Sequence, residues 1–232
     1  LLDNIYDEKY INSGPFAEFI KIDTQGTEYE ILQGAKKVLQ KDTVALVIEV
    51  SFFEVYKGQK LFSDIEQLLR KNGFAFYGFS SKLHSRSCKF IDKQNEITRE
   101  RVMWSDAVFF RDPITSKKAY SKRQNQSIFI ASLLLGFYDY SVEIASNILY
   151  IEDSTQRKKS LDLIKKLAYM SPEKLRKDLD QLQHQIDIAP ERANISIGGF
   201  VDERRTICNY DDILGVSSLP LSFNSSSISH IS

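Results

Sequence analysis

The chain has 232 residues, of which 42% are hydrophobic and 12% aromatic, so it can form one sizeable domain with an appendage around a packed core. Lysine plus arginine equals aspartate plus glutamate at 31 each, so no overall field draws the chain toward a polyanion. We therefore expect a globular protein with no nucleic-acid partner.

The cysteines and the apolar runs narrow the class of protein further. Cys88 and Cys208 lie in no CxxC or Cys/His cluster, which argues against a disulfide framework and against a zinc site. The longest uncharged apolar run, residues 127–138, is shorter than the roughly 20 residues of a membrane helix, and no leader-like segment opens the sequence. We expect a cytoplasmic chain with no transmembrane segment and no metal.

The most informative stretch is residues 19–35, FIKIDTQGTEYEILQGA. Its first four residues predict a short strand buried on both faces, and residues 23–27 predict a polar turn. One amphipathic helix is expected to follow, with Thr24 or Thr27 as its cap and with acids in its first turn.

Three more strands are predicted before residue 113, at residues 44–50, 74–79 and 101–111. A helix separates the first two of these, at residues 63–73, with Ser63 as a cap and Gly73 as its end. The strand at 19–22 and the strand at 44–50 form a β-α-β unit, which requires a parallel pair. No helix separates the last two strands, so we expect them to be antiparallel neighbours.

Beyond residue 113 the pattern changes from strands to long stretches at helical spacing. Helices are predicted at residues 117–135, 138–151, 155–169 and 172–187. We expect three units: an α/β unit over 1–113, a helical extension over 114–197, and a largely disordered, serine-rich tail over 198–232.

Several separate pieces of the first unit carry a resemblance to a known family. Residues 21–28, KIDTQGTE, continue into ILQGA at 31–35, and the next strand contains VIEV at 47–50. LDNI at 2–5 precedes this signature, and WSDAVFF at 104–110 forms the last predicted strand. Together they resemble the carboxyl half of an FkbM-type methyltransferase, a family of S-adenosylmethionine-dependent O-methyltransferases.

The resemblance implies a fold, a reaction and a cofactor. The implied fold is a partial Rossmann-like α/β fold, with the last strands of a doubly wound sheet and an antiparallel final pair. The implied reaction is methyl transfer from S-adenosylmethionine to a hydroxyl, with a carbohydrate or glycolipid as the acceptor.

The sequence departs from the family in one respect. No GxGxG occurs anywhere, so the glycine-rich turn that holds the cofactor has no counterpart, and strands one to three of the fold are missing. We expect a fragment that is inactive by itself, whose strand at 19–22 has a bare edge. A homo-oligomer or a partner chain is expected to cover that edge.

The candidate site residues lie at the carboxyl ends of the parallel strands, where ligands bind in such sheets. Asp23 and Glu49 are the catalytic candidates, because a carboxylate there can help to remove the hydroxyl proton. Asp23, Gln25 and Gly26 are expected to contact the cofactor, and Gln25 and Glu28 the substrate. Simpler roles remain open: a helix-dipole acid for Glu28, a positive φ for Gly26, and a lysine partner for Glu49.

Aromatic residues offer a further candidate surface. Phe52, Phe53, Tyr56 and Trp104 are able to line a substrate cleft, since aromatic faces suit sugar rings, although Trp104 fits a core position better. Two function classes stay open. The chain is either the incomplete sequence of a methyltransferase or a non-enzymatic partner-binding or assembly module built on a degenerate half-domain; a glycan-handling protein without transfer activity is a third option.

Overall fold

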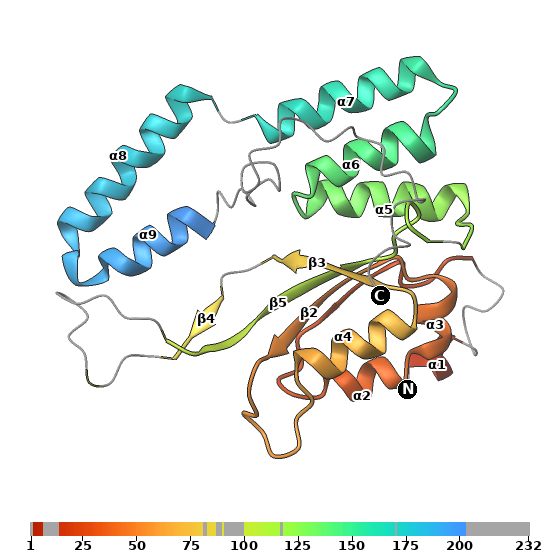
Figure 1. Cartoon of the computed structure of the whole chain (residues 1–232), viewed down its shortest axis with the longest axis horizontal. Coiled ribbons are helices and arrows are strands. Elements are labelled where there is room, and N and C mark those ends of the chain that lie inside the picture. The colour runs from red at the N-terminus through yellow and green to blue at the C-terminus, as the bar shows by residue number, and fades with distance from the viewer. Residues whose placement is uncertain are drawn as a thin grey trace, which may run out of the picture.

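The computed structural model describes residues 2–6, 14–80, 83–86, 90, 100–116, 118–169 and 171–202. In these ranges a β-sheet lies between two groups of helices, and a helical hairpin stands to one side of this layered body (Figure 1). Cys88 and Cys208 lie outside the described residues, as does most of the predicted tail.

One mixed sheet contains all the strands of the described residues. They are β1 (Phe19–Ile22), β2 (Ala45–Ser51), β3 (Ala75–Phe79), β4 (His84–Ser85) and β5 (Val102–Phe110). The strand order is β1-β2-β5-β3, and β4 pairs with the first part of β5. β1 and β2 are parallel, whereas β5 is antiparallel to β2 and β3. This arrangement confirms the predicted partial Rossmann-like fold, its β-α-β unit and its antiparallel final pair.

The connection from β1 to β2 differs from the single helix that the sequence predicts. It contains two short helices, α2 (Glu28–Gln33) and α3 (Lys36–Lys41). The Asp3 carboxylate, from α1 (Leu2–Ile5), accepts the N–H groups of Lys37 and Val38 at 3.0 and 3.2 Å. These groups need an external partner at a helix start, so a residue distant in sequence supports the break.

The next helix, α4 (Phe62–Lys71), begins differently from the prediction that Ser63 caps it. Its N-cap residue is Leu61, whose N–H donates to the Asp64 carboxylate at 3.0 Å. Gly73 follows the helix with a φ of 83°, a positive value that glycine adopts readily after a helix end, as predicted.

The sheet has a hydrophobic core on each of its two faces. Alternate residues of β2 enter opposite cores: Leu46 and Ile48 pack with α2 to α4, and Ala45 and Val47 pack with α5 (Lys122–Leu134) and α6 (Tyr138–Ile144). The helices after residue 114 therefore begin by covering the sheet. The predicted domain boundary at that residue stays a prediction.

β1 is more exposed than its apolar sequence predicts. Phe19 and Lys21 are exposed, and Ile22 is the buried residue of this strand. The prediction of a strand buried on both faces is wrong. Phe19 and Lys21 pair with Ala45 and Val47, so they lie on the face that α5 and α6 cover at β2, but they are exposed at the end of the sheet.

The remaining helices agree closely with the predicted stretches. α6 continues into a π-helical turn (Ala145–Leu149), and α7 (Ser154–Ala168) and α8 (Pro172–Ile188) follow. A short 3-10 turn (Pro190–Arg192) leads into α9 (Ala193–Asp202), which carries helical structure past the residue where the sequence predicts disorder to begin. No helix within the described ranges is both long and apolar enough to cross a membrane.

Arg111, directly after β5, is a buried cation that joins the sheet to two helix ends. Its guanidinium donates to the carbonyl oxygens of Thr43 and Asn72 at 2.9 and 3.0 Å, and also to that of Leu39. The same group lies 4.3 Å from the centroid of the Phe74 ring. Burial lowers the pKa of Arg111 from its ordinary value. The guanidinium thus satisfies carbonyl groups at the ends of α3 and α4 that have no intrahelical partner.

Candidate active site

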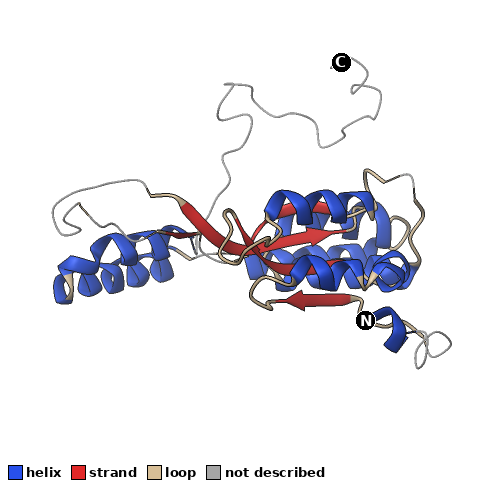
Figure 2. Ribbon diagram, turned by 90° about the horizontal axis from the view of Figure 1, so that it is seen from below, coloured by secondary structure: helices blue, strands red, loops and turns tan. Residues whose placement is uncertain are grey.

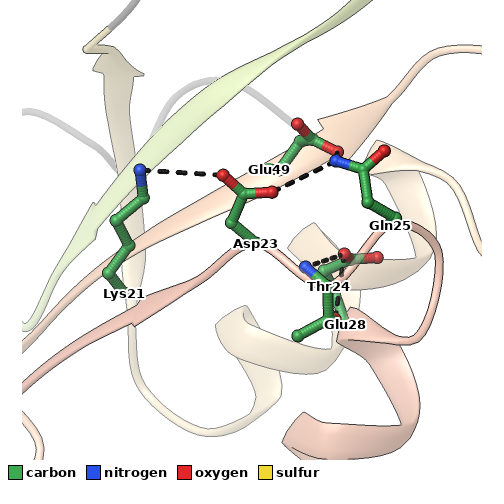
Figure 3. Close-up of polar contacts among 6 residues, drawn as sticks. All are labelled: Lys21, Asp23, Thr24, Gln25, Glu28 and Glu49. Atoms are coloured by element: carbon green, nitrogen blue, oxygen red, sulfur yellow. Dashed lines mark hydrogen bonds and ion pairs between the residues drawn. The ribbon is translucent and has the colours of Figure 1, made fainter.

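The turn between β1 and α2 brings three of the predicted site residues together (Figure 3). Gln25 Nε2 donates to Asp23 Oδ1 at 3.2 Å and to Glu49 Oε1 at 3.0 Å. Lys21 Nζ lies 3.8 Å from the other oxygen of Asp23. Because β1 and β2 are parallel neighbours, Asp23 after the first and Glu49 near the end of the second meet at one edge of the sheet.

The backbone of this turn is unusual at Gln25. Its φ is 58°, in the left-handed region that residues other than glycine adopt rarely, and Gly26 follows with a φ of 111°. Such a conformation costs about 1–3 kcal/mol and persists only where its surroundings enforce it. The left-handed conformation at Gln25 accompanies the bridge that its amide makes between the two carboxylates. The sequence predicts the positive φ at Gly26 but gives no signal for Gln25.

The buried Glu28 carboxylate accepts hydrogen bonds from the turn. Its side chain is buried, with the residue only 3% exposed, and its carboxylate accepts the N–H and hydroxyl of Thr24 at 2.9 and 3.1 Å. The N–H of Gly26 donates to both carboxylate oxygens, at 3.1 and 3.0 Å. This geometry makes Glu28 a positioning residue of the turn. Its predicted contact with the substrate stays a prediction.

The prediction that a threonine caps α2 is correct for the position of Thr27 and wrong for its side chain. The N-cap residue is Thr27, but its side chain makes no capping bond. Thr27 Oγ1 instead donates to the hydroxyl of Thr24 at 3.0 Å, and Thr24 in turn donates to Glu28. The two hydroxyl groups therefore extend the network around Glu28 instead of serving the helix start.

Electrostatics distinguish Glu49 from an ordinary surface acid. Partial burial raises the pKa of Glu49, and the negative charges of Asp23, Glu28 and Asp106 raise it further, while the bond from Gln25 opposes them. Asp106 stands directly opposite Glu49 in the register of β2 and β5. A carboxylate with a raised pKa is better matched to accepting a proton near neutral pH. The sequence places Asp106 in the last strand but gives no sign of this pairing.

The loop between β2 and α4 packs on the same turn. A Cβ atom added at Gly26 would lie 2.7 Å from Cδ2 of Tyr56, so the Tyr56 ring rests on the glycine, and Tyr56 is 50% exposed. Gln59 shapes this loop, because its Oε1 accepts the N–H of Val55 at 3.0 Å and its Nε2 donates to Ser51 Oγ at 3.2 Å. Sequence reasoning missed Gln59, which lies in no recognisable motif.

The other candidate aromatic residues have different neighbours. Phe52 packs against the core on the α2–α4 face of the sheet, together with Phe62, and the two ring centroids are 5.6 Å apart. Trp104 is partly buried and stacks on His84, with centroids 3.6 Å apart and planes 8° from parallel. Tyr56 is thus the predicted aromatic residue that the structure brings against the turn.

Comparison with known proteins identifies the segment that contains this site. Residues 2–76 match the family model described as the methyltransferase FkbM domain. No curated protein and no solved structure matches the chain. The match ends before residues 104–110, so the likeness of that strand to the family's last strand stays a prediction. The matched segment holds Asp23, Gln25 and Glu49, so the candidate site lies in the part of the chain that is similar to the FkbM methyltransferase domain.

Proposed function

We propose that the complete protein is an O-methyltransferase that moves a methyl group from S-adenosylmethionine to a hydroxyl of a carbohydrate or glycolipid. The observation that carries the proposal is the pair of carboxylates, Asp23 and Glu49, joined by Gln25 at the sheet edge of the FkbM segment. The cytoplasmic setting and the acceptor class remain predictions within this proposal.

The described residues fit one side of the cofactor. Two carboxylates at the carboxyl ends of neighbouring strands suit a positively charged sulfonium and the hydroxyl groups of a ribose or an acceptor sugar. The Gly26 N–H, a candidate for cofactor binding, already donates to Glu28. When bound, S-adenosylmethionine would supply the methyl group, and the nucleoside would need a cradle from outside the described sheet.

The chain's own residues then have distinct roles. Glu49 receives the acceptor hydroxyl proton on a carboxylate oxygen, because its raised pKa matches that task better than an ordinary carboxylate. Asp23 accepts a hydrogen bond from a neighbouring hydroxyl of the acceptor and so orients the acceptor. Gln25 fixes the spacing of the two carboxylates, and Glu28 fixes the turn that carries Gln25.

The half-exposed Tyr56 ring supports a sugar as the acceptor. It packs on Gly26, next to Gln25, and therefore offers an aromatic face close to the two carboxylates. Aromatic faces combine with nearby carboxylates to bind sugar rings through apolar contact and hydroxyl hydrogen bonds. An uncharged sugar ring, with one apolar C–H face and several hydroxyl groups, fits this combination.

The proposal is tested by joining the chain to the residues encoded upstream of Leu1. Calorimetry with S-adenosylmethionine should show little binding to this chain and clear binding to the extended protein. The extended protein should transfer labelled methyl groups to glycan acceptors, and Asp23→Asn and Glu49→Gln should reduce turnover at least tenfold while cofactor binding persists. Unchanged turnover in both variants would overturn the roles given to Asp23 and Glu49. Tight binding of S-adenosylmethionine by the present chain would contradict the expectation that the nucleoside site lies outside the described sheet.

A second function is favoured by the open edge of β1. Among the described residues β1 pairs only with β2, and Phe19 on it is exposed. An open apolar edge accepts a strand from another chain, so a non-enzymatic partner-binding or assembly module fits the same structure. A start codon close to Leu1, with no methyl transfer by the full protein, would favour this alternative.

A further inference from the structure

The hairpin of α8 and α9 has an apolar stripe suited to helix packing. Leu175, Leu179, Leu182 and Ile186 follow one another at intervals of four, three and four residues along α8. This spacing places all four side chains on one side of the helix, as in helix bundles. α9 and the 3-10 turn pack against α8 as the second half of the hairpin.

The hairpin leaves much apolar surface in contact with water. No residue of α8 is fully buried, and Leu179 in the middle of its stripe is 46% exposed. On α9, Ile195 is 71% and Val201 55% exposed. In the described part of the chain α8 and α9 pack mainly against each other and the turn between them, and both views show them beside the layered body (Figures 1 and 2). Two helices alone cannot enclose such surfaces, so a further element is expected to cover them.

The charges of α8 indicate what that element is. Asp180 is the middle residue of this 17-residue helix. The eight residues before it carry three positive and two negative side chains, for a net charge of +1, and the eight after it carry only the negative Asp187, for a net charge of −1. Two copies of α8 packed antiparallel would set the positive half of each against the negative half of the other.

The positions of Arg176 and Asp187 make this match specific. They are 11 residues apart, close to three full turns, so both lie on the same side of α8, and both are exposed. A two-fold axis between them places Arg176 of one copy opposite Asp187 of the other, twice in the same interface. Leu179 lies three residues after Arg176, on the exposed border of the apolar stripe.

We propose that the α8–α9 hairpin is a self-association surface, on which a second copy of this chain docks with the two α8 helices antiparallel. The two hairpins form a four-helix bundle that covers the leucine stripe and the exposed face of α9. This surface is separate from the β1 edge and from the candidate active site, and the proposal does not depend on the methyltransferase assignment.

The oligomeric state of the full chain is the first test. Size-exclusion chromatography with light scattering over a concentration series should give a dimer, and Leu179→Glu should give a monomer. Leu134→Glu is the matched control, because Leu134 is an 81% exposed leucine on α5, far from the hairpin in the sequence, and this variant should remain dimeric. A wild-type monomer at every concentration, or a dimer that Leu179→Glu leaves intact, would contradict the proposal.

A charge exchange gives the sharper test. Arg176→Glu and Asp187→Arg should each weaken the dimer about tenfold, because each creates two like-charge pairs per interface. The double variant should regain most of that affinity. The two residues are about 16 Å apart along one helix, so a rescue requires two chains. Failure of the rescue, with circular dichroism unchanged, would overturn the antiparallel pairing.

A third variant tests whether a second copy or the chain's own residues 203–232 cover the hairpin. Removal of residues 203–232 should leave the dimer unchanged if a second copy occupies the hairpin. If the shortened chain dimerises while the full chain is monomeric, residues of that segment cover the hairpin and the proposal is wrong.

Discussion

Gln25 Nε2 lies 3.0 Å from Glu49 Oε1, so the amide of the turn after β1 stabilises the charged carboxylate at the end of β2. Gln25→Ala should therefore raise the pKa of Glu49 further, because the charged form loses a donor. Carbon NMR titration of the side-chain carboxyl measures this directly. Gln33→Ala on the exposed side of α2 is the control, and a pKa that stays constant or falls in Gln25→Ala would refute the argument.

The raised pKa of Glu49 also predicts how stability depends on pH. The folded protein holds the Glu49 proton more tightly than the unfolded chain, so folding loses stability as pH rises from the ordinary pKa near 4.5 through the raised value. Glu49→Gln removes this loss. The unfolding free energy of the variant minus that of wild type should therefore be larger at pH 7 than at pH 4. The increase should be less than about 1 kcal/mol, because solvent screens the site. Urea unfolding of Glu49→Gln and of the exposed-loop control Glu54→Gln at both pH values checks the sign.

Glu28 and Glu30 form a matched pair in the first turn of α2, one buried and one exposed. Glu28→Ala should cost about 2–4 kcal/mol of unfolding free energy, because the donors of Thr24 and Gly26 lose their acceptor. Glu30→Ala should cost no more than about 1 kcal/mol, the effect of the helix dipole alone. Chemical denaturation of both variants compares them, and equal costs would show that the buried network contributes little.

Gly26 and Gly58 both have positive φ values, of 111° and 77°, but only Gly26 has a neighbour in the way. Gly58→Ala should cost roughly 1 kcal/mol for backbone strain, whereas Gly26→Ala should cost more, because its Cβ would lie 2.7 Å from Tyr56 Cδ2. In a Tyr56→Ala background the cost of Gly26→Ala should fall toward that of Gly58→Ala. Thermal unfolding of the four variants completes this cycle, and an unchanged cost would show that Tyr56 does not rest on the glycine.

Local patterns predicted much of the fold correctly. The apolar runs at 19–22 and 44–50 are parallel strands, and the last two long strands are antiparallel neighbours, because connection length and the presence of a helix decide strand direction. The meeting of Asp23 with Glu49 was predictable for the same reason, since the carboxyl ends of parallel neighbours share one edge. The FkbM signature of this segment was also readable from the sequence.

Predictions about single residues at element boundaries were less successful. Ser63 and the threonines around 24–27 are good cap residues by type, yet Leu61 precedes α4 and Glu28 takes the turn's donors. Several polar groups compete for the same few N–H groups, and small differences in geometry select among them. Local propensity therefore predicted most of the helices but not the residues that cap their starts.

The sequence by itself predicted most of the helices and strands in their order, a likeness to the FkbM family that the match over residues 2–76 supports, and the strand ends that carry the acids. Only the tertiary structure decided that Gln25 bridges those acids in a left-handed conformation, that Glu28 turns inward, and that Tyr56 rests on Gly26. The first group follows from local features of the sequence: periodicity predicts the helices and strands, and a run of motifs carries the family likeness. The second depends on contacts between residues far apart in the chain, as between Gln25 and Glu49, and these contacts exist only when the sheet and its loops have packed.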